Sequence, residues 1–523
     1  MKRDWADGYV SDINYSFGYY QELAPSFIQF ALLLNGYSPP ATHGKYNYCE
    51  LGFGHGVSAN IFAAANPRGQ FWGTDINPDH ALFASNIANT SGISANWKDC
   101  SFEEFLELDT PQFDFITLHG VWSWISPAAQ HTIVEILRRK LKVGGAVFLS
   151  YNVLPGWGAE MPLRELLRMH TQYASPTGTT TSNKITQALN FAQTLKESGA
   201  AYFTEHPQAA NQLQDMLGSD SSYLAHEYFN RSWEITYFAD LAATLEAAKL
   251  TFACSLHASD LLGEFRHKPQ FNGLLDKNAS NLLRETVNDY ALNRRFRRDV
   301  FVRGARRLSE QERNARLLAL KFMPVKATEE ISLQAKTPYG SFTLSESLYR
   351  PVINAFSSVI KPITLNQLRQ DQEVATLSVS DLVEVIGVMV ARQDIHPIFE
   401  NEDFSYAKTQ CKKLNQVIAE RALYYNDIKY LSSPVTGKAV EANRFELLFW
   451  LAWQEGKRTP EELAKRGWEY FSALGQPMAT ANGLMNTEHD SLTAFKNNAH
   501  RFVEKILPLW LKLEILTHDL KNK

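Results

Sequence analysis

The sequence predicts an α/β protein: a mostly parallel sheet wound with helices, followed by a mostly α-helical C-terminal region. From about residue 46 to 152, short apolar runs alternate with helical patterns, which is typical of parallel strands joined by crossover helices. A glycine-rich turn closes the first run, and the alternation is lost beyond about residue 310. With 523 residues, the chain is too long for a single core. We therefore expect several domains.

Four apolar runs define the first part of the sheet. They are Tyr46–Leu51, Gln70–Thr74, Phe113–Leu118 and Ala146–Tyr151, and a further strand is expected to end at Asp99. Ahead of the last run, Ser126 and Pro127 are typical of the start of a helix, and Gly144-Gly145 predict its end. This order of signals predicts a βαβ unit.

Two later strand-like runs, Leu250–His257 and Asp299–Val302, are expected to complete the same sheet after a stretch of helices. The sequence therefore predicts three regions. Residues 1–152 and 246–308 form the α/β core, residues 153–245 a helical insertion, and residues 309–523 a mostly helical C-terminal domain. A helix-turn-helix pattern with a wing between Ile363 and Pro397 makes that last domain winged-helix-like.

The composition is that of an ordinary globular protein, with 21% charged residues and a net charge of −4. This balance gives no general attraction to nucleic acid or anionic membranes. The four cysteines form no CxxC pair and the histidines lack ligand spacing, so no metal site is expected. The start of the chain is unlike a signal peptide, and no apolar run approaches the ~20 residues that span a bilayer. We expect a cytoplasmic protein without membrane insertion.

The strongest local signal is Tyr48-Cys-Glu-Leu-Gly-Phe-Gly-His-Gly56. Gly52, Gly54 and Gly56 let the backbone turn closely beneath a ligand. A dinucleotide fingerprint needs a further glycine where this chain has Val57. Glu50 would place a carboxylate where a pyrophosphate prefers bare backbone N–H groups. A carboxylate suits a positively charged ligand instead.

Two more acidic residues follow at the spacing of successive strands. Asp75, 25 residues after Glu50, ends the second run and, next to Ile76, can hold both hydroxyls of a ribose. Asp99 lies 24 residues further on, where its carboxylate and the adjacent Cys100 and Ser101 can contact an adenine. A single aspartate is usually a helix cap or a solvated loop residue. Three acids at successive strand ends predict a nucleoside site with a positive group, which fits S-adenosylmethionine (AdoMet).

These features resemble the successive motifs of class I AdoMet-dependent methyltransferases. The resemblance includes the glycine loop, Asp75, Asp99, the strand Phe113–His119 and the turn Leu141–Gly145. It implies a Rossmann-like, seven-stranded methyltransferase sheet with AdoMet as the cofactor.

Further motifs resemble the subgroup that carries a methyltransferase regulatory domain, which includes rickettsial protein-lysine methyltransferases that modify outer-membrane proteins. These motifs are residues 119–124, 150–157, 223–228 and 296–304. The resemblance covers about residues 10–310 and is weak beyond, where it is limited to general layout and residues 432–437. It implies that the insertion is a lid or substrate region and that the C-terminal domain binds substrate or regulates activity.

Candidate catalytic residues follow the fourth and fifth strands. His119 either polarises or deprotonates the methyl acceptor, or it lines the cofactor pocket through a hydrogen bond; the sequence leaves both open. Trp122 belongs either to the acceptor pocket or to the core. Tyr151 and Asn152 resemble a polar pair that orients an amino acceptor, but they depart from the Asn-Pro-Pro-Tyr form. Tyr20 is expected to fold over the cofactor from the N-terminus, together with Tyr15 and Tyr19.

Three functions remain open from the sequence. The first is a protein-lysine N-methyltransferase, favoured by the subgroup motifs. The second is a small-molecule methyltransferase, and the third is a non-catalytic AdoMet sensor or DNA-binding regulator. The arginines between positions 294 and 307 alternate with apolar residues, which favours a strand with charged flanks over a phosphate-binding surface. The expected partner is therefore a protein or small-molecule acceptor, and nucleic acid is not expected.

Overall fold

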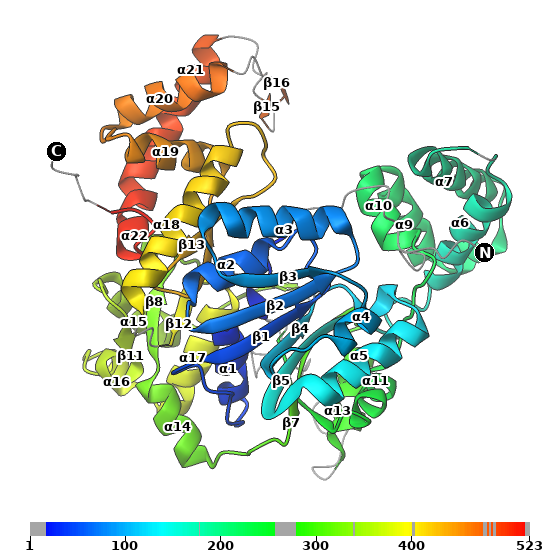
Figure 1. The fold of residues 1–523 in the computed structure, drawn as a ribbon, viewed down its shortest axis with the longest axis horizontal. Helices are drawn as coiled ribbons and strands as arrows, with labels where there is room; N and C mark the ends of the chain where they lie inside the picture. The colour runs from blue at the N-terminus through cyan, green and yellow to red at the C-terminus, as the bar shows by residue number, and fades with distance from the viewer. Residues whose placement is uncertain are drawn as a thin grey trace.

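A seven-stranded sheet with strand order β3-β2-β1-β4-β5-β7-β6 forms the centre of the computed structural model (Figure 1). The structure describes residues 17–176, 178–256, 279–337, 340–399, 403–473, 479–480, 483–484 and 488–517. The strands are β1 Tyr46–Leu51, β2 Gly69–Asp75, β3 Ala95–Asp99, β4 Phe113–Leu118, β5 Leu141–Asn152, β6 Leu250–Ser255 and β7 Phe296–Arg303. The predicted fold class is confirmed, and the two late runs do join the same sheet.

Strand direction places the ends of β1 to β5 at one edge of the sheet. Each neighbouring pair among these five strands is parallel, whereas β7 runs antiparallel to both β5 and β6. Open sheets of this kind bind their ligands outside the carboxyl ends of the parallel strands. The edge that carries the loops after β1 to β5 is therefore the expected ligand-binding edge of the sheet.

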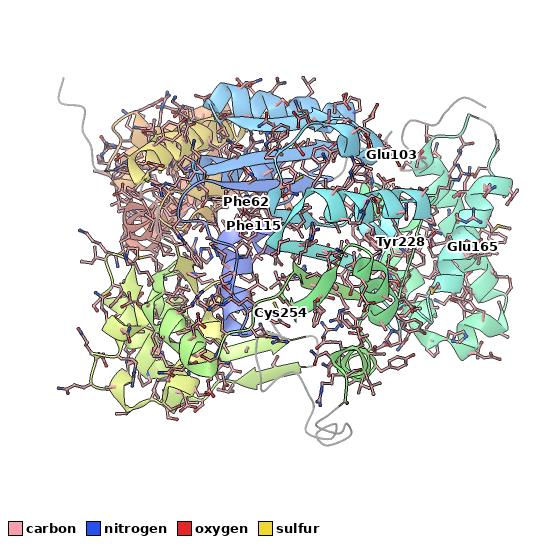
Figure 2. All side chains as sticks on the ribbon, turned by 60° about the horizontal axis from the view of Figure 1, so that its bottom comes forward. Phe62, Glu103, Phe115, Glu165, Tyr228 and Cys254 are labelled. Carbon is pink, nitrogen blue, oxygen red and sulfur yellow. The ribbon has the colours of Figure 1, made fainter. Side chains whose placement is uncertain are left out.

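Alternating side chains along the strands serve two cores, one on each face of the sheet. Phe115 packs with Phe62 in the first core, where Figure 2 labels both residues, and Ile116 belongs to the second core. The first face carries α1 Pro25–Leu34, α2 Val57–Ala65 and α3 Pro78–Ser91. The second carries α4 Phe102–Glu107, α5 Pro127–Lys140 and α11 Phe238–Glu246. Helix α13, Asn281–Ala291, packs against α11.

The predicted C-terminal end of the helix that begins at Pro127 is wrong. Helix α5 ends at Lys140 and β5 begins at the next residue, so Gly144-Gly145 lie inside the strand. Gly144 has a φ of +83°, and the pairing of β5 with β4 shifts register in this stretch. Arg303 donates hydrogen bonds to the Arg138 and Leu141 carbonyls, which satisfies groups that a helix end leaves open.

The insertion between β5 and β6 is helical and has its own apolar core. It contains α6 Met161–Tyr173, α7 Thr181–Glu197, α8 Ala201–Glu205, α9 Pro207–Leu217 and α10 Ser221–Tyr228. Leu163, Leu189 and Leu213 pack together with Trp157 in this core. Figure 1 shows these helices grouped on one side of the sheet, and Figure 2 labels Glu165 and Tyr228 there.

The C-terminal region begins with a small module of helices around a three-stranded sheet, and the predicted wing between Ile363 and Pro397 is not formed as a hairpin there. Its three-stranded sheet has the order β11-β8-β12 and accompanies α15 and α17. The elements are α14 Glu310–Ala319, β8 Lys321–Pro324, β9 Gln334–Thr337, β10 Gly340–Thr343, α15 Glu346–Ser357, β11 Ile363–Thr364, α16 Leu365–Leu368, α17 Val379–Ala391 and β12 Ile395–Ile398.

The rest of the C-terminal region is mainly helical. It comprises α18 Phe404–Arg421, the hairpin of β13 Tyr430–Ser433 and β14 Lys438–Glu441, α19 Arg444–Gln454, α20 Pro460–Ser472, β15 Ala479–Thr480, β16 Gly483–Leu484, α21 Glu488–Arg501, the π-helix η7 Phe502–Ile506 and α22 Leu507–Lys512. Helix α18 packs against α2 and α3. The Asn66 side chain at the end of α2 donates to the Gly437 carbonyl at 2.9 Å. One continuous apolar core therefore joins this region to the sheet.

The arginine-rich segment around β7 contributes an arginine to the buried core. Arg297 is fully buried and forms ion pairs with Asp299 at 2.7 Å, Asp289 at 2.6 Å and Glu285 at 2.7 Å. Its guanidinium also lies 4.2 Å from the centre of the Phe238 ring. The preference for a strand with charged flanks is borne out at this position, because the charge is neutralised inside the core.

The four cysteines are free thiols, buried except for the half-buried Cys100. Among the residues that the structure describes, no helix combines the length and apolar character needed to cross a bilayer. Within the same residues, no group of three or more His, Cys, Asp or Glu side chains is arranged to hold a metal ion.

We predict that Arg297→Met lowers the free energy of unfolding by about 3–5 kcal/mol, because it leaves Asp299 buried without its cation and leaves Asp289 with Arg294 alone. Urea denaturation measures the change. Arg306→Met is the matched control: this guanidinium is 61% exposed beside Glu312, and its loss should cost less than about 1 kcal/mol. Equal effects of the two substitutions would contradict the role given to the buried charges.

Candidate active site

The three predicted acidic residues lie along one edge of the sheet. Glu50 is the penultimate residue of β1, and Asp75 and Asp99 are the last residues of β2 and β3. Asp75 and Asp99 are direct neighbours in the register of these two strands. Glu50 and Asp75 are 4% and 8% exposed, whereas Asp99 is exposed. The first two therefore lie in a protected position and the third at its rim.

Glu50 accepts a hydrogen bond from Tyr48, two positions earlier in β1, a residue for which the sequence predicts no role. Tyr48 donates its hydroxyl hydrogen bond to Glu50 Oε2 at 3.3 Å, and its oxygen lies 2.8 Å from Thr117 Oγ1. Burial raises the pKa of Glu50 to about 8, and the negative charge of Asp75 adds to this effect. The carboxyl group ionises more readily when a cation lies beside it. Tyr48 could have been found from strand periodicity, since residues two apart share a face.

Asp75 connects the glycine-rich loop to α3. Its Oδ2 accepts the Gly54 N–H at 2.8 Å, and its Oδ1 accepts the Asn77 N–H at 2.9 Å. His80 Nδ1 lies 3.2 Å from Oδ1. The half-buried Ile76 follows directly. A carboxylate has about four lone-pair positions, so these three contacts leave about one position, on Oδ2, for a hydroxyl donor.

The glycine-rich loop needs its glycines for two different reasons. A Cβ at Gly52 would lie 2.5 Å from Val121 Cγ2, so packing of the loop after β4 excludes a larger residue. Gly54 has a φ of +57°, and no atom lies within 4 Å of the place where its Cβ would be. The Gly54 backbone is therefore open on that side, which is a surface that a ligand can approach closely. Gly56, also at positive φ, is the N-cap residue before α2.

The loop after β3 is fixed by its own contacts. The Cys100 carbonyl accepts a hydrogen bond from Thr74 Oγ1, and the Cys100 sulfur lies 3.2 Å from the same hydroxyl. Ser101 caps α4: its Oγ accepts the Glu104 N–H at 3.2 Å, and its own N–H donates to Glu104 Oε2 at 2.8 Å. The side chain of Ser101 is thus used for capping, and the exposed Asp99 is the polar side chain available in this loop.

His119, directly after β4, lies against Tyr20. Their ring centres are 3.7 Å apart with 33° between the planes. Ser150 Oγ is 3.2 Å from His119 Nδ1 and accepts the Gly120 N–H at 2.8 Å. Burial, with a smaller effect of the Arg298 charge, lowers the pKa of His119 to about 3. The imidazole is therefore neutral at physiological pH.

Tyr20 is largely buried and is fixed through its backbone. Its backbone N–H donates to Ser58 Oγ at 2.9 Å, which fixes the N-terminal segment to the first turn of α2. Burial raises the pKa of Tyr20 to about 12, and the charges of Glu22, Glu227 and Glu50 act in the same direction. Arg298 pairs with Glu22 at 2.7 Å. Tyr15 lies outside the described residues.

The other predicted catalytic residues take different positions. Trp122 is 3% exposed and packs in the core on the second face of the sheet. Tyr151 donates to Asp299 Oδ2 at 2.7 Å, so its hydroxyl contacts the buried ion pairs of β7. Asn152 is 5% exposed and donates its N–H to Ser123 Oγ at 2.8 Å, while its side-chain nitrogen has no hydrogen-bond partner among the described residues. Because strand side chains alternate, Asn152 shares the face of Ser150, and Tyr151 points the other way.

A stack of rings connects the glycine-rich loop to the C-terminal region. Phe17 stacks on His55 with ring centres 4.0 Å apart, and His55 lies 4.4 Å from His80. Arg421, the last residue of α18, lies 5.1 Å from the Phe17 ring centre. Burial, together with His80, lowers the pKa of His55 to about 4. No local sequence signal marks this stack, because its members come from both ends of the chain.

Two family models match the chain. Residues 49–145 match a methyltransferase domain, and residues 220–303 match a predicted methyltransferase regulatory domain. The structure of PKMT2 from Rickettsia typhi in complex with AdoHcy is similar, with a TM-score of 0.68 at 18% identity, over 96% of this chain and 99% of that one. The fold, the site and these matches define a class I AdoMet-dependent methyltransferase with a regulatory domain.

The uncharacterized protein sll1526 of Synechocystis sp. is 35% identical over 512 residues, which is 98% of this chain and 99% of the relative. The chain belongs to the family of this cyanobacterial protein. The uncharacterized protein RP028 of Rickettsia prowazekii is 28% identical over 218 residues, covering 41% of this chain and 84% of the relative.

We predict that Asp75→Ala weakens AdoMet binding at least about a hundred-fold, on the order of 3 kcal/mol, because it removes the acceptor for Gly54 and for the ribose hydroxyls. Isothermal titration calorimetry measures the Kd. Asp79→Ala is the matched control, since this exposed carboxylate lies four residues further along the chain in the first turn of α3. A Kd for Asp75→Ala close to that of the control would contradict the placement of the ribose.

The pKa of Glu50 predicts a pH dependence of AdoMet binding. A cation pairs with the ionised carboxyl group, so below pH 8 binding must first expel a proton, and the Kd should rise about ten-fold for each pH unit lost. Glu50→Gln should bind weakly and show little change between pH 6 and 8. Proton release is measured by calorimetry in buffers of different ionisation enthalpy. A wild-type Kd that is constant over this range would rule the assignment out.

Proposed function

We propose that the chain is a protein-lysine N-methyltransferase. The observation that carries this proposal is the environment of Tyr20 beside His119. The Tyr20 and His119 rings are in contact, and the charge of Glu227 acts on the tyrosine, while Glu22 is paired with Arg298. Negative charge attracts an amine that arrives as an ammonium ion, and the rings exclude water from it. A neutral alcohol or carbon acceptor would gain nothing from this negative charge.

The residues at the sheet edge fit AdoMet. The protected carboxyl group of Glu50 suits its ammonium group, the open side of Gly54 lets the cofactor approach closely, and Asp75 has about one lone-pair position left for a ribose hydroxyl. Asp99 at the rim suits the amino group of adenine. When bound, AdoMet supplies a methyl group on a positively charged sulfur. His119 and Tyr20 would then lie on the side of the site where an acceptor approaches.

The neutral state of His119 favours an orienting role over a basic one. A general base works best with a pKa near the working pH, and a pKa of about 3 gives little driving force. When Nδ1–H donates to Ser150 Oγ, the Nε2 lone pair is available to accept an N–H of the acceptor amine. This contact would turn the amine lone pair toward the methyl group.

Loss of the proton from the lysine is assisted by its surroundings. Enclosure by Tyr20, His119 and Phe296 disfavours the ammonium form and lowers its pKa. The proton would leave to solvent before transfer, because a carboxylate near the amine attracts the ammonium ion but does not assist its deprotonation. The side-chain N–H group of Asn152 without a partner is a further donor near the acceptor. The full-length likeness to PKMT2 of Rickettsia typhi supports the same substrate class.

Mass spectrometry of a cell lysate incubated with the protein and isotope-labelled AdoMet tests this function. We expect labelled methyl groups on lysine side chains of one or a few proteins. Glu50→Gln should leave the lysate unlabelled, because it weakens cofactor binding. Label confined to low-mass compounds would identify a small-molecule methyltransferase instead. Binding of AdoMet without any transfer would identify a sensor.

A further inference from the structure

A polar cavity of about 260 Å³ lies between the helical insertion and the start of β7. Its walls include four side-chain amides and one ion pair. The amides belong to Gln208, Asn211, Gln212 and Asn293, and the ion pair joins Glu160 and Arg295. Clefts that enclose a cofactor or a drug-sized ligand have about 300–1,000 Å³. This cavity therefore suits one or two residues of a longer chain.

The cavity lies close to the acceptor side of the active site. The cavity lies where β5 ends and the antiparallel β7 begins, since Gly156 and Arg295 both line it. The next residue, Phe296, has its ring centre 6.3 Å from that of His119, while strand alternation turns the Arg295 side chain to the other face. An extended peptide advances about 3.3 Å per residue. A peptide with its lysine at His119 therefore reaches the cavity with residues only a few positions away.

The inner residues of the cavity are fixed by contacts with the surrounding structure. The Arg295 guanidinium lies 4.1 Å from the centre of the Trp157 ring, and Trp157 Nε1 donates to the Arg295 carbonyl at 2.9 Å. Gln212 Nε2 donates to the Tyr228 hydroxyl at 2.9 Å. Asn293 has a φ of +44°, a left-handed conformation that asparagine tolerates better than most residues. A site fixed in this way loses little freedom when it binds a partner.

The outer wall, in contrast, has unused hydrogen-bonding groups. Gln208 and Asn211 are exposed on α9, and their side chains make no hydrogen bond with another residue in the described part of the chain. A side-chain amide has donors and an acceptor, which matches the peptide group of an extended backbone. The carboxylates of Glu160 and Asp215 outnumber the single cation of Arg295 here.

We infer that this cavity is the subsite that binds the polypeptide next to the methylated lysine, holding a backbone amide and an uncharged polar or cationic side chain. The inference rests on the proposed function and assigns the recognition of the flanking sequence to α9 and the start of β7. Specificity then comes from the insertion, while the methyl group and the amine are held by the sheet edge.

The test compares two acceptors: N-acetyl-lysine amide, which has no flanking residues, and a library of lysine peptides with randomised flanks. Asn211→Trp fills the cavity from an exposed helix position, so the fold should be retained. We expect it to lower kcat/KM for the peptides at least ten-fold and to remove their flanking-sequence preference. Its rate with N-acetyl-lysine amide and its AdoMet Kd should equal those of the wild type.

Gln214→Trp is the matched control, because Gln214 is exposed on the same helix and does not line the cavity. It should behave as the wild type with both acceptors. If wild type methylates lysine and Asn211→Trp acts on the peptides like the control, the subsite is overturned while the proposed function stands. If the wild type binds AdoMet and methylates neither acceptor, the proposed function fails and the subsite fails with it.

Discussion

The contact on which the site depends is the pair of hydrogen bonds from Gly54 and Asn77 to the two oxygens of Asp75. One carboxylate at the end of β2 thereby fixes the turn after β1 and the start of α3 in a single position. The parallel register of the two strands brings these groups to the same level of the sheet. Glu50 and the open side of Gly54 have their positions because this loop cannot move independently of β2.

Burial gives the ionisable groups of the site opposite tendencies. A carboxyl group loses solvation when it is enclosed and keeps its proton, as Glu50 does, whereas an imidazole gives its proton up, as His119 does. The unliganded edge of the sheet therefore carries less charge than its composition suggests. A cationic ligand restores the charge of the carboxyl group where it binds. The site therefore binds ligands that carry positive charge more tightly than neutral ones.

The two ends of the chain contribute to a site that is built mainly by its middle. The N-terminal segment places Tyr20 on His119, while the neighbouring Tyr19 accepts a hydrogen bond from the Ala439 N–H at 3.0 Å. Arg421 adds a second connection through Phe17. Since these contacts belong to the same apolar core as α2, the C-terminal region is part of the support of the cofactor loop.

The sequence by itself determined the sheet, the glycine-rich loop and the places of Glu50, Asp75 and Asp99, because these depend on strand periodicity and on turn chemistry within short segments. It could not decide the roles of His119, Trp122 and Tyr151. All three lie near a strand end, and their roles depend on which face of the sheet each side chain takes and on what packs there. It also missed the ring stack over His55 and the cavity lined by α9, whose parts are distant in the chain. Only the tertiary structure brings such residues together, because packing of separate elements carries no local signal.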